Sequence, residues 1–290
     1  MNLTIGLLCS GELGLKCIKQ LSQSFQPQFI FTDKKSNEII EYAQSHSIPI
    51  YIGNPRNDDT SVFLDRFQTD IIFSINYIFI VKNNILVHPK LYAINLHGSL
   101  LPKYRGRTPH VWAIINGEKE TGISAHLMAE GCDTGDIIMQ KRIPILQEYT
   151  GGDILNIFKD MYSEMILEIL SQIKTDHLLR IPQDNHKATY FKKRIPEDGL
   201  INWSWQKDQI FNWVRAQAFP YPGAFSFYKG KKIIIDKISF SEEGFDDSMQ
   251  NGLIVKTQPK VLVKTPNGII ELSDIRNEHE VKLEVNNKFE

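Results

Sequence analysis

The chain of 290 residues has few cysteines, no long apolar run and no excess of charge of either sign. Its three cysteines, Cys9, Cys17 and Cys132, are odd in number and lack a paired metal-type spacing, which favours a reducing compartment. No window reaches eighteen apolar residues, and the first residues lack the basic and apolar regions of a secretory signal. The formal net charge of −1 argues against a chain whose main task is to bind nucleic acid. We therefore expect a cytoplasmic protein with no membrane segment.

Apolar runs alternate with helical patterns along the first part of the chain. We expect an α/β fold with a doubly wound, mostly parallel sheet, because such alternation is typical of it. Strands are predicted at residues 3–9, 29–32, 50–52, 71–74, 94–96, 122–128 and 137–143, and helices near 15–21, 39–43, 62–67, 108–115 and 153–173. No internal repeat or low-complexity tract is evident.

The last part of the chain changes character. A helical pattern near residues 208–218 precedes short strands broken by Gly, Pro and Asn, which suits a small OB-like β-barrel. We expect a catalytic domain over residues 1–187, a linker over 188–205 and the C-terminal β domain over 206–290. The aromatic residues Trp203, Trp205, Phe211 and Trp213 are interpreted as core.

The most informative segment follows the strand at residues 94–96. It reads Asn-Leu-His-Gly-Ser-Leu-Leu-Pro-Lys-Tyr-Arg-Gly-Arg from Asn95 to Arg107. Asn95 and His97 alternate to one side of the strand and can act on one reacting centre. Asp133 comes thirty-six positions after His97, in a Cys-Asp-Thr-Gly-Asp turn. An imidazole near its ordinary pKa suits acid/base work at neutral pH, and we expect a carboxylate neighbour to raise that pKa.

These residues, in this order and spacing, resemble the formyltransferases that use 10-formyltetrahydrofolate. This family includes methionyl-tRNA formyltransferase and the sugar N-formyltransferases. The resemblance also covers Arg194-Ile-Pro-Glu-Asp-Gly-Leu-Ile-Asn-Trp203, Asn212-Trp-Val-Arg-Ala216 and Pro220-Tyr-Pro-Gly-Ala-Phe225. It runs from residue 1 to about residue 275 and is strongest to the formyltransferase domain that acts on UDP-4-amino-4-deoxyarabinose.

The resemblance implies a role for each residue of the motif. His97 would be the acid/base, Asn95 would stabilise the oxyanion, and Asp133 would hold and charge the imidazole. The co-substrate would be 10-formyltetrahydrofolate, and its contacts would be Phe79, Ile80, Val81, Arg107, Ala129, Glu130, Gly131, Cys132 and Asp133. By sequence alone, the contacts outside the catalytic three could also be core and turn residues, and the resemblance favours the binding role.

Four further residues are candidates for substrate binding. Ser10 and Gly11 follow the first strand as a phosphate-binding turn would, but no G-x-G-x-x-G is present and helix packing explains them as well. Lys103 and Arg105 could meet a diphosphate, and a solvated loop explains them nearly as well. The remaining histidines show no ligand spacing, so we expect no catalytic metal: His46, His88, His110, His126, His177, His186 and His279. Cys132 is interpreted as packing, since the chemistry needs no nucleophilic thiol.

The acceptor is expected to be a nucleotide-linked amino sugar of cell-surface polysaccharide biosynthesis, with no nucleic-acid partner. Methionyl-tRNA formyltransferases carry a basic insertion after the second strand, whereas residues 32–38 here pass almost directly into a helix. Methionyl-tRNA formylation stays open as an alternative, as does a folate-binding relic without activity. Glycinamide ribonucleotide transformylases lack the second domain and are a poorer match. The C-terminal barrel could bind a ligand, support a homodimer or merely pack.

Overall fold

The computed structural model describes residues 3–57, 59–276 and 281–290, and the chain divides into two compact units. The first unit holds the chain up to Gly106 together with Gly122–Ile143 and Asn156–Tyr190. The second holds Arg107–Thr121, Pro144–Leu155 and the chain from Phe191 onward. The three-part division expected from the sequence, with boundaries at 187 and 205, stays a prediction.

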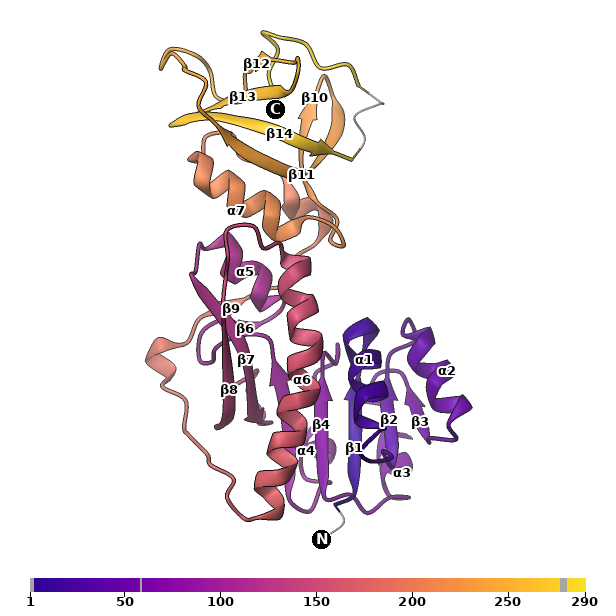
Figure 1. Cartoon of the computed structure of the whole chain (residues 1–290). Helices are drawn as coiled ribbons and strands as arrows, with labels where there is room; N and C mark the ends of the chain where they lie inside the picture. The colour runs from indigo at the N-terminus through magenta and orange to yellow at the C-terminus, as the bar shows by residue number, and fades with distance from the viewer. Residues whose placement is uncertain (1–2, 58, 277–280) are drawn as a thin grey trace. The chain divides into compact units, whose positions relative to one another are not determined.

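A seven-stranded sheet forms the first unit, in the order β3-β2-β1-β4-β5-β7-β8 (Figure 1). The pairs from β3 to β5 are parallel, and β7 runs antiparallel to β5. Most of the parallel strands are apolar along their whole length because helices cover both faces of the sheet. The strands are β1 (Ile5–Cys9), β2 (Phe29–Thr32), β3 (Ile50–Ile52), β4 (Ile71–Ile75), β5 (Tyr92–His97), β7 (Glu120–Leu127) and β8 (Ile137–Pro144).

The helices lie on both faces of this sheet. Gly14 of α1 packs against the side chain of Cys9, while Leu64 of α3 and Ile85 of α4 join a buried cluster with Leu8. Neighbouring residues of a strand point to opposite faces, so α1 lies opposite α3 and α4. The helices of the first unit are α1 (Gly11–Leu21), α2 (Asn37–Ser45), α3 (Asp59–Leu64), α4 (Asn83–Leu86) and most of α6 (Gly151–Lys174), whereas α5 (Pro109–Ile115) belongs to the second unit.

The doubly wound, mostly parallel sheet predicted from the sequence is confirmed. A small sheet of β6 (Arg105–Gly106) and β9 (Tyr190–Phe191) was not predicted, because each strand has only two residues and its partner lies far away in the sequence. Two short 3-10 helices, Asn185–Lys187 and Pro196–Gly199, follow in the polar stretch after α6. Among the described residues, no helix has both the length and the apolar character needed to span a membrane.

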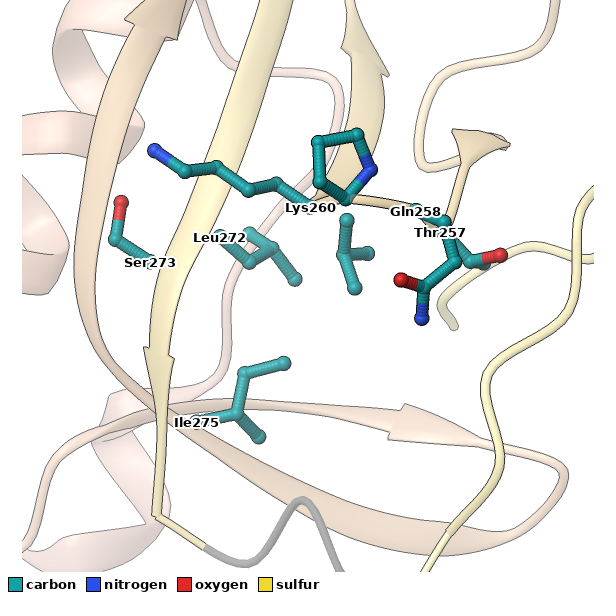
Figure 2. A pocket seen from close by; sticks show the side chains of 8 residues that line it. Thr257, Gln258, Lys260, Leu272, Ser273 and Ile275 are labelled. Atoms are coloured by element: carbon teal, nitrogen blue, oxygen red, sulfur yellow. The ribbon is translucent and has the colours of Figure 1, made fainter.

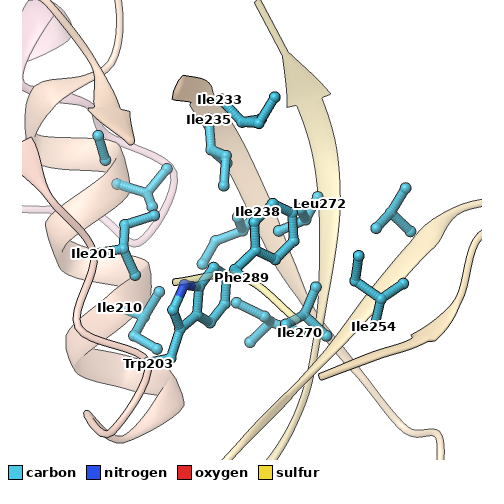
Figure 3. Close-up of a cluster of buried hydrophobic side chains, with 14 of the residues drawn as sticks. Ile201, Trp203, Ile210, Ile233, Ile235, Ile238, Ile254, Ile270, Leu272 and Phe289 are labelled. Atoms are coloured by element: carbon cyan, nitrogen blue, oxygen red, sulfur yellow. The ribbon is translucent and has the colours of Figure 1, made fainter. Parts of the chain in front are cut away.

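The second unit contains a curled antiparallel sheet and the helix α7 (Lys207–Gln217). Trp203 and Phe289 stack at 5.2 Å between ring centres inside a cluster of buried side chains from α7 and the sheet (Figure 3). The small C-terminal β domain and the core role of Trp203 are therefore confirmed. The sheet order is β10-β11-β14-β13-β12, with β10 (Ala224–Tyr228), β11 (Lys231–Ser241), β12 (Ile254–Lys256), β13 (Val261–Thr265) and β14 (Gly268–Ile275).

A hollow of about 230 Å³ lies on this C-terminal sheet (Figure 2). Its lining includes Gln258, Lys260 and Ser273, and the ammonium group of Lys260 is paired with Glu271. It contains none of the site residues expected from the sequence.

Candidate active site

The expected catalytic motif begins on β5. Asn95 and His97 are two residues apart on this strand, so their side chains leave the same face of the sheet. β5 lies between β4 and β7, and His97 is its last residue. Both side chains therefore lie at the carboxyl end of an inner strand, where open α/β sheets bind their ligands.

The imidazole of His97 is buried, and its two nitrogens face different neighbours. Nε2 lies 2.8 Å from the carbonyl oxygen of Tyr104, whereas Nδ1 lies 3.6 Å from Oδ2 of Asp133. A carbonyl oxygen can only accept, so Nε2 carries the proton and the neutral ring keeps its lone pair on Nδ1. The separation from Asp133 is too long for a direct hydrogen bond. Nδ1 is therefore the nitrogen that can take up a proton, with a carboxylate beside it.

Burial lowers the pKa of His97 below its ordinary value. The carboxylate of Asp133 and the bond to Tyr104 act in the opposite direction, while the nearby His126 and Arg105 add to the lowering. Asp133 raises the pKa of His97, as expected from the sequence, but desolvation of the buried ring has the larger effect and the net shift is downward. His97 is consequently unprotonated at neutral pH and competent as a base.

The carboxylate of Asp133 is held at both oxygens. Oδ2 accepts the backbone N–H of Gly106 at 2.9 Å, and Oδ1 lies 3.5 Å from the donor Nδ2 of Asn95. Burial raises the pKa of Asp133, but His97 and the Gly106 N–H oppose it, and the pKa lies well below its ordinary value. The ionised carboxylate can therefore stabilise an imidazolium at His97 once a proton has moved there.

His126 belongs to the site, although the sequence did not reveal it. It is buried on β7, directly opposite Asn95 in the antiparallel pairing. Its Nδ1 lies 2.7 Å from the carbonyl oxygen of Leu127, so the neutral ring carries its proton there and accepts at Nε2. Sequence reasoning had set His126 aside for lack of ligand spacing, and only the pairing of β5 with β7 brings it to the site.

The amide of Asn95 is oriented by this neighbour. Its Nδ2 lies 3.1 Å from the accepting Nε2 of His126 and 3.5 Å from Oδ1 of Asp133. One N–H is thus fixed by His126, and the second is held only by a long contact. That second N–H can turn to an oxygen that becomes negative during a reaction.

Base, carboxylate and amide donor together suit acyl transfer through a tetrahedral species. The base accepts a proton from an attacking nucleophile, and the amide stabilises the oxyanion. The structure brings Asn95, His97 and Asp133 together as expected from the sequence, and their roles stay a prediction.

Two loops expected to contact the folate converge on one apolar cluster. Phe79 and Val81, after β4, and Met128, after β7, pack against the cluster of Leu8, Phe31 and Tyr51. Ile80 is exposed between them, and residues 129–132 form an exposed segment that leads to Asp133. The loops therefore share one side of the sheet beside the catalytic residues. Arg107 is exposed in the second unit, directly after Gly106.

The first two substrate candidates lie in a closed turn. Ser10 is buried, and the N–H of Gly11 donates to Oγ of Ser36 at 2.9 Å. Ser36 in turn donates to Asp33 at 2.6 Å. The Gly11 donor therefore already has a partner within the protein, which does not favour the phosphate contact expected for this turn.

The other two candidates differ sharply in burial. Lys103 is exposed, whereas Arg105 is 1% exposed and bonds to side chains of its own unit. This placement of Arg105 is contrary to the diphosphate contact expected from the sequence, since a buried guanidinium group offers no surface to a ligand.

Metal ligation has no support in the part of the chain that the structure describes, where no cluster of three or more His, Cys, Asp or Glu side chains could hold an ion. His279 lies outside the described residues.

Comparison with known proteins identifies the family. A profile described as formyl transferase matches residues 10–170, and one described as formyl transferase, C-terminal domain, matches residues 193–290. The chain is 36% identical over 264 residues to the bifunctional polymyxin resistance protein ArnA of Wigglesworthia glossinidia brevipalpis, covering 89% of this chain but only 39% of that protein. It is 33% identical over 247 residues to the methionyl-tRNA formyltransferase of Dictyoglomus thermophilum, covering 84% of this chain and 79% of that protein.

A solved structure supports the same fold. The N-formyltransferase from Helicobacter canadensis, in complex with folinic acid and dTDP-3-aminofucose, has a TM-score of 0.69 at 20% identity, covering 93% of this chain and 99% of that chain. At this identity the likeness concerns the fold alone. With the first profile matching more than half of the sequence, the chain belongs to the formyl transferase family.

Proposed function

We propose that this protein transfers the formyl group of 10-formyltetrahydrofolate to the amino group of a nucleotide-linked amino sugar. The acceptor nitrogen attacks the formyl carbon, and Nδ1 of His97 takes the proton that this nitrogen loses. Asn95 stabilises the oxyanion, and Asp133 stabilises the imidazolium. The proton then passes from His97 to the departing folate nitrogen as the tetrahedral species collapses, which leaves the formylated amine and tetrahydrofolate.

The folate is assigned to the side of the sheet where residues 79–81 and 128–132 converge. Packing of Phe79, Val81 and Met128 on one apolar cluster suits a flat heterocycle with backbone donors and acceptors at its edge. The solved N-formyltransferase from Helicobacter canadensis, which shares the fold, holds folinic acid. Cys9, Cys17 and Cys132 form no disulfide in the described structure, which suits reaction in the cytoplasm.

The proposal of a sugar acceptor rests on the short connection between β2 and α2. This connection has only residues 33–36, and the side chain of Asp33 closes it by accepting from the N–H of Lys35 at 2.8 Å and from Ser36. Gly11 binds the same Ser36. This connection is short and closed by hydrogen bonds, so it has no room for a basic loop that would bind a tRNA acceptor stem. The amino-sugar nucleotide in the Helicobacter canadensis structure favours the same choice.

Methionyl-tRNA formylation is the second candidate. It is favoured by the 33% identity to the Dictyoglomus thermophilum enzyme, which nearly equals the identity to ArnA. The product of the sugar reaction would enter cell-surface polysaccharide, whereas the product of the tRNA reaction would serve initiation of translation.

A panel of acceptors separates the two. Purified protein is incubated with 10-formyltetrahydrofolate and UDP-, dTDP- or GDP-linked 3-amino and 4-amino sugars, or with methionyl-tRNA, and formyl gain is measured by mass spectrometry. We expect an amino sugar to be formylated, and Asn95→Ala and His97→Ala to reduce turnover. Formylation of methionyl-tRNA faster than of every sugar would overturn the acceptor, and unchanged turnover in both variants would overturn the catalytic assignment.

A further inference from the structure

Arg105 is a fully buried cation whose bonding partners in the described part of the chain are neutral. Its Nε and Nη2 donate to Oε1 of Gln183 at 3.1 and 2.7 Å, and Nη2 also donates to Oδ1 of Asn185 at 2.9 Å. Nη1 donates to the hydroxyl of Tyr190 at 2.5 Å. A buried charge is tolerated only when hydrogen bonds replace its water, so these contacts fix all three partners in place.

Gln183 links Arg105 to the turn that contains Asp133. Its Nε2 donates to the carbonyl oxygens of Asp133 at 2.9 Å and Gly135 at 2.6 Å. The amide oxygen of Gln183 is occupied by the cation, so its N–H groups must point to the opposite side. Arg105 therefore sets the orientation of the amide that holds the backbone of Asp133.

The backbone around Arg105 holds the other parts of the site. The preceding residue, Tyr104, offers the carbonyl that fixes His97, and the following residue, Gly106, donates its N–H to the carboxylate of Asp133. The N–H of Arg105 itself donates to the carbonyl of Thr189 at 2.8 Å. Anchoring of Arg105 thus fixes the position of three groups that meet at the base.

We propose that Arg105 and Gln183 form a clamp that positions Asp133 against His97 for formyl transfer. Neither touches a reacting atom, so both are positioning residues. The clamp rests on the proposed formyl transfer but not on the identity of the acceptor amine.

The test replaces Gln183 and a matched glutamine in the second unit. Gln217 is more deeply buried than the half-buried Gln183, but it likewise accepts from an arginine, Nη2 of Arg194 at 2.6 Å, and donates to a backbone carbonyl, that of Trp213 at 2.8 Å. Gln183→Met and Gln217→Met therefore remove the same kind of bridge between an arginine and the backbone. We expect both to lower the unfolding temperature, but only Gln183→Met to lower kcat, by about tenfold to a hundredfold, because small misplacements of a catalytic group have effects of that size. The KM for both substrates should stay near that of the wild type.

A double-mutant cycle tests whether the loss of kcat in Gln183→Met acts through Asp133. If Gln183 acts through Asp133, Gln183→Met should reduce kcat much less in an Asp133→Asn background than in the wild type. Gln217→Met should have the same small effect in either background.

Arg105→Lys provides a second variant that keeps the charge. A lysine cannot bond Gln183, Asn185 and Tyr190 in one fixed geometry, so kcat should fall as in Gln183→Met. Unchanged kcat in Gln183→Met and Arg105→Lys, equal losses in Gln183→Met and Gln217→Met, or independent effects in the cycle would each overturn the clamp. All rates are measured with the acceptor that the wild type formylates. A failure of the sugar assignment therefore appears in the wild type alone, whereas a failure of the clamp appears in the ratio of variant to wild type.

Discussion

At the scale of single residues, backbone carbonyls decide how the two buried histidines work. Tyr104 binds the proton on Nε2 of His97 and so leaves Nδ1 as its base, whereas Leu127 binds Nδ1 of His126 and leaves Nε2 as an acceptor. The two rings therefore have opposite tautomers, and each suits the role proposed for it, His97 as a base and His126 as the acceptor that orients an amide.

Asp133→Asn should shift the acid limb of the pH–rate profile to lower pH. A base works only when unprotonated, so activity is present above the pKa of His97 and is lost as the pH falls through it. Burial already lowers that pKa, and Asp133 opposes the lowering. Without the charge of Asp133 the pKa falls further, while kcat also falls because the imidazolium loses its stabilising partner. The profile of kcat/KM against pH measures the shift.

An acid limb that stays in place, or moves to higher pH, would contradict the pairing of Asp133 with His97. The unfolding temperature of Asp133→Asn at neutral pH serves as the control for folding.

His126→Phe should lower kcat while binding of folate persists. Phenylalanine fills much of the space but offers no acceptor to Nδ2 of Asn95, so the amide can turn its oxygen toward the reacting centre. A misdirected oxyanion donor has an effect of about 3 kcal/mol. His88→Phe is a matched control, because Nε2 of His88 is buried without a hydrogen-bond partner in the described structure. Folate affinity is measured by calorimetry beside kcat; equal turnover in the two variants would refute the role of His126.

Sequence reasoning succeeded for residues that share one strand and failed for partners brought by folding. Asn95 and His97 lie two positions apart on β5, so their common side follows from the period of a strand. The place of His126 in the site depends on the antiparallel register of β7 against β5. The contact of Gln183 with Asp133 depends on how the polar stretch after α6 folds back to the turn that contains Asp133. The burial of Arg105 was missed for the same reason, since its partners lie about eighty residues later in the chain.

At the scale of elements, β7 and β8 form the flank of the sheet beside β5. Gly122 on β7 is packed so closely that a Cβ atom there would lie 2.0 Å from the carbonyl oxygen of Lys141 on β8. A glycine is required at this position by the approach of the two strands. β7 also carries His126, so displacement of the strand would disturb the site.

Gly122→Ala should destabilise the protein by roughly 1–3 kcal/mol or more, because a rigid backbone oxygen must move to admit the methyl group. Gly244→Ala should have an effect within about 0.5 kcal/mol, since no atom lies within 4 Å of the corresponding position. Urea unfolding of both variants measures the difference. Equal stability of the two variants would show that β7 and β8 can move apart without a loss in the free energy of unfolding.

Most elements were predictable because the apolar pattern of buried parallel strands is continuous. β2 and β3 match their predicted bounds, and the bounds of α5, α6 and α7 differ from the predicted ones by no more than two residues. The single turn α4 and the sheet of β6 and β9 escaped prediction. Elements of two to four residues carry too little pattern, and long-range pairing rather than local preference forms the two-residue strands.

At the scale of the whole molecule, charge is nearly balanced but unevenly distributed. Residues 187–232 contain nine Lys or Arg against three Asp or Glu, whereas residues 241–290 contain six against ten. A surface that tracks the phosphates of a tRNA would need an excess of basic residues over a larger area.

The KM for the sugar acceptor should therefore depend weakly on salt. A diphosphate presents few charges, whereas each tRNA phosphate neutralised by the protein releases counterions and steepens the dependence. KM is measured from low to moderate NaCl with the best acceptor from the panel, and free tRNA is tested as an inhibitor. Strong inhibition by tRNA that disappears with salt would contradict a sugar acceptor.

The bond from the N–H of Gly106 to Asp133 limits what mutational scanning can reveal about this enzyme. The donor belongs to the main chain, as does the carbonyl of Tyr104 that fixes His97. A side-chain replacement at Tyr104 leaves its carbonyl in place, and a replacement of Gly106, whose φ is 101°, adds backbone strain, so a scan would isolate neither backbone group. Replacement of the peptide bond before Gly106 by an ester, which exchanges the N–H for an oxygen without adding a side chain, would measure a contribution that no codon change can isolate.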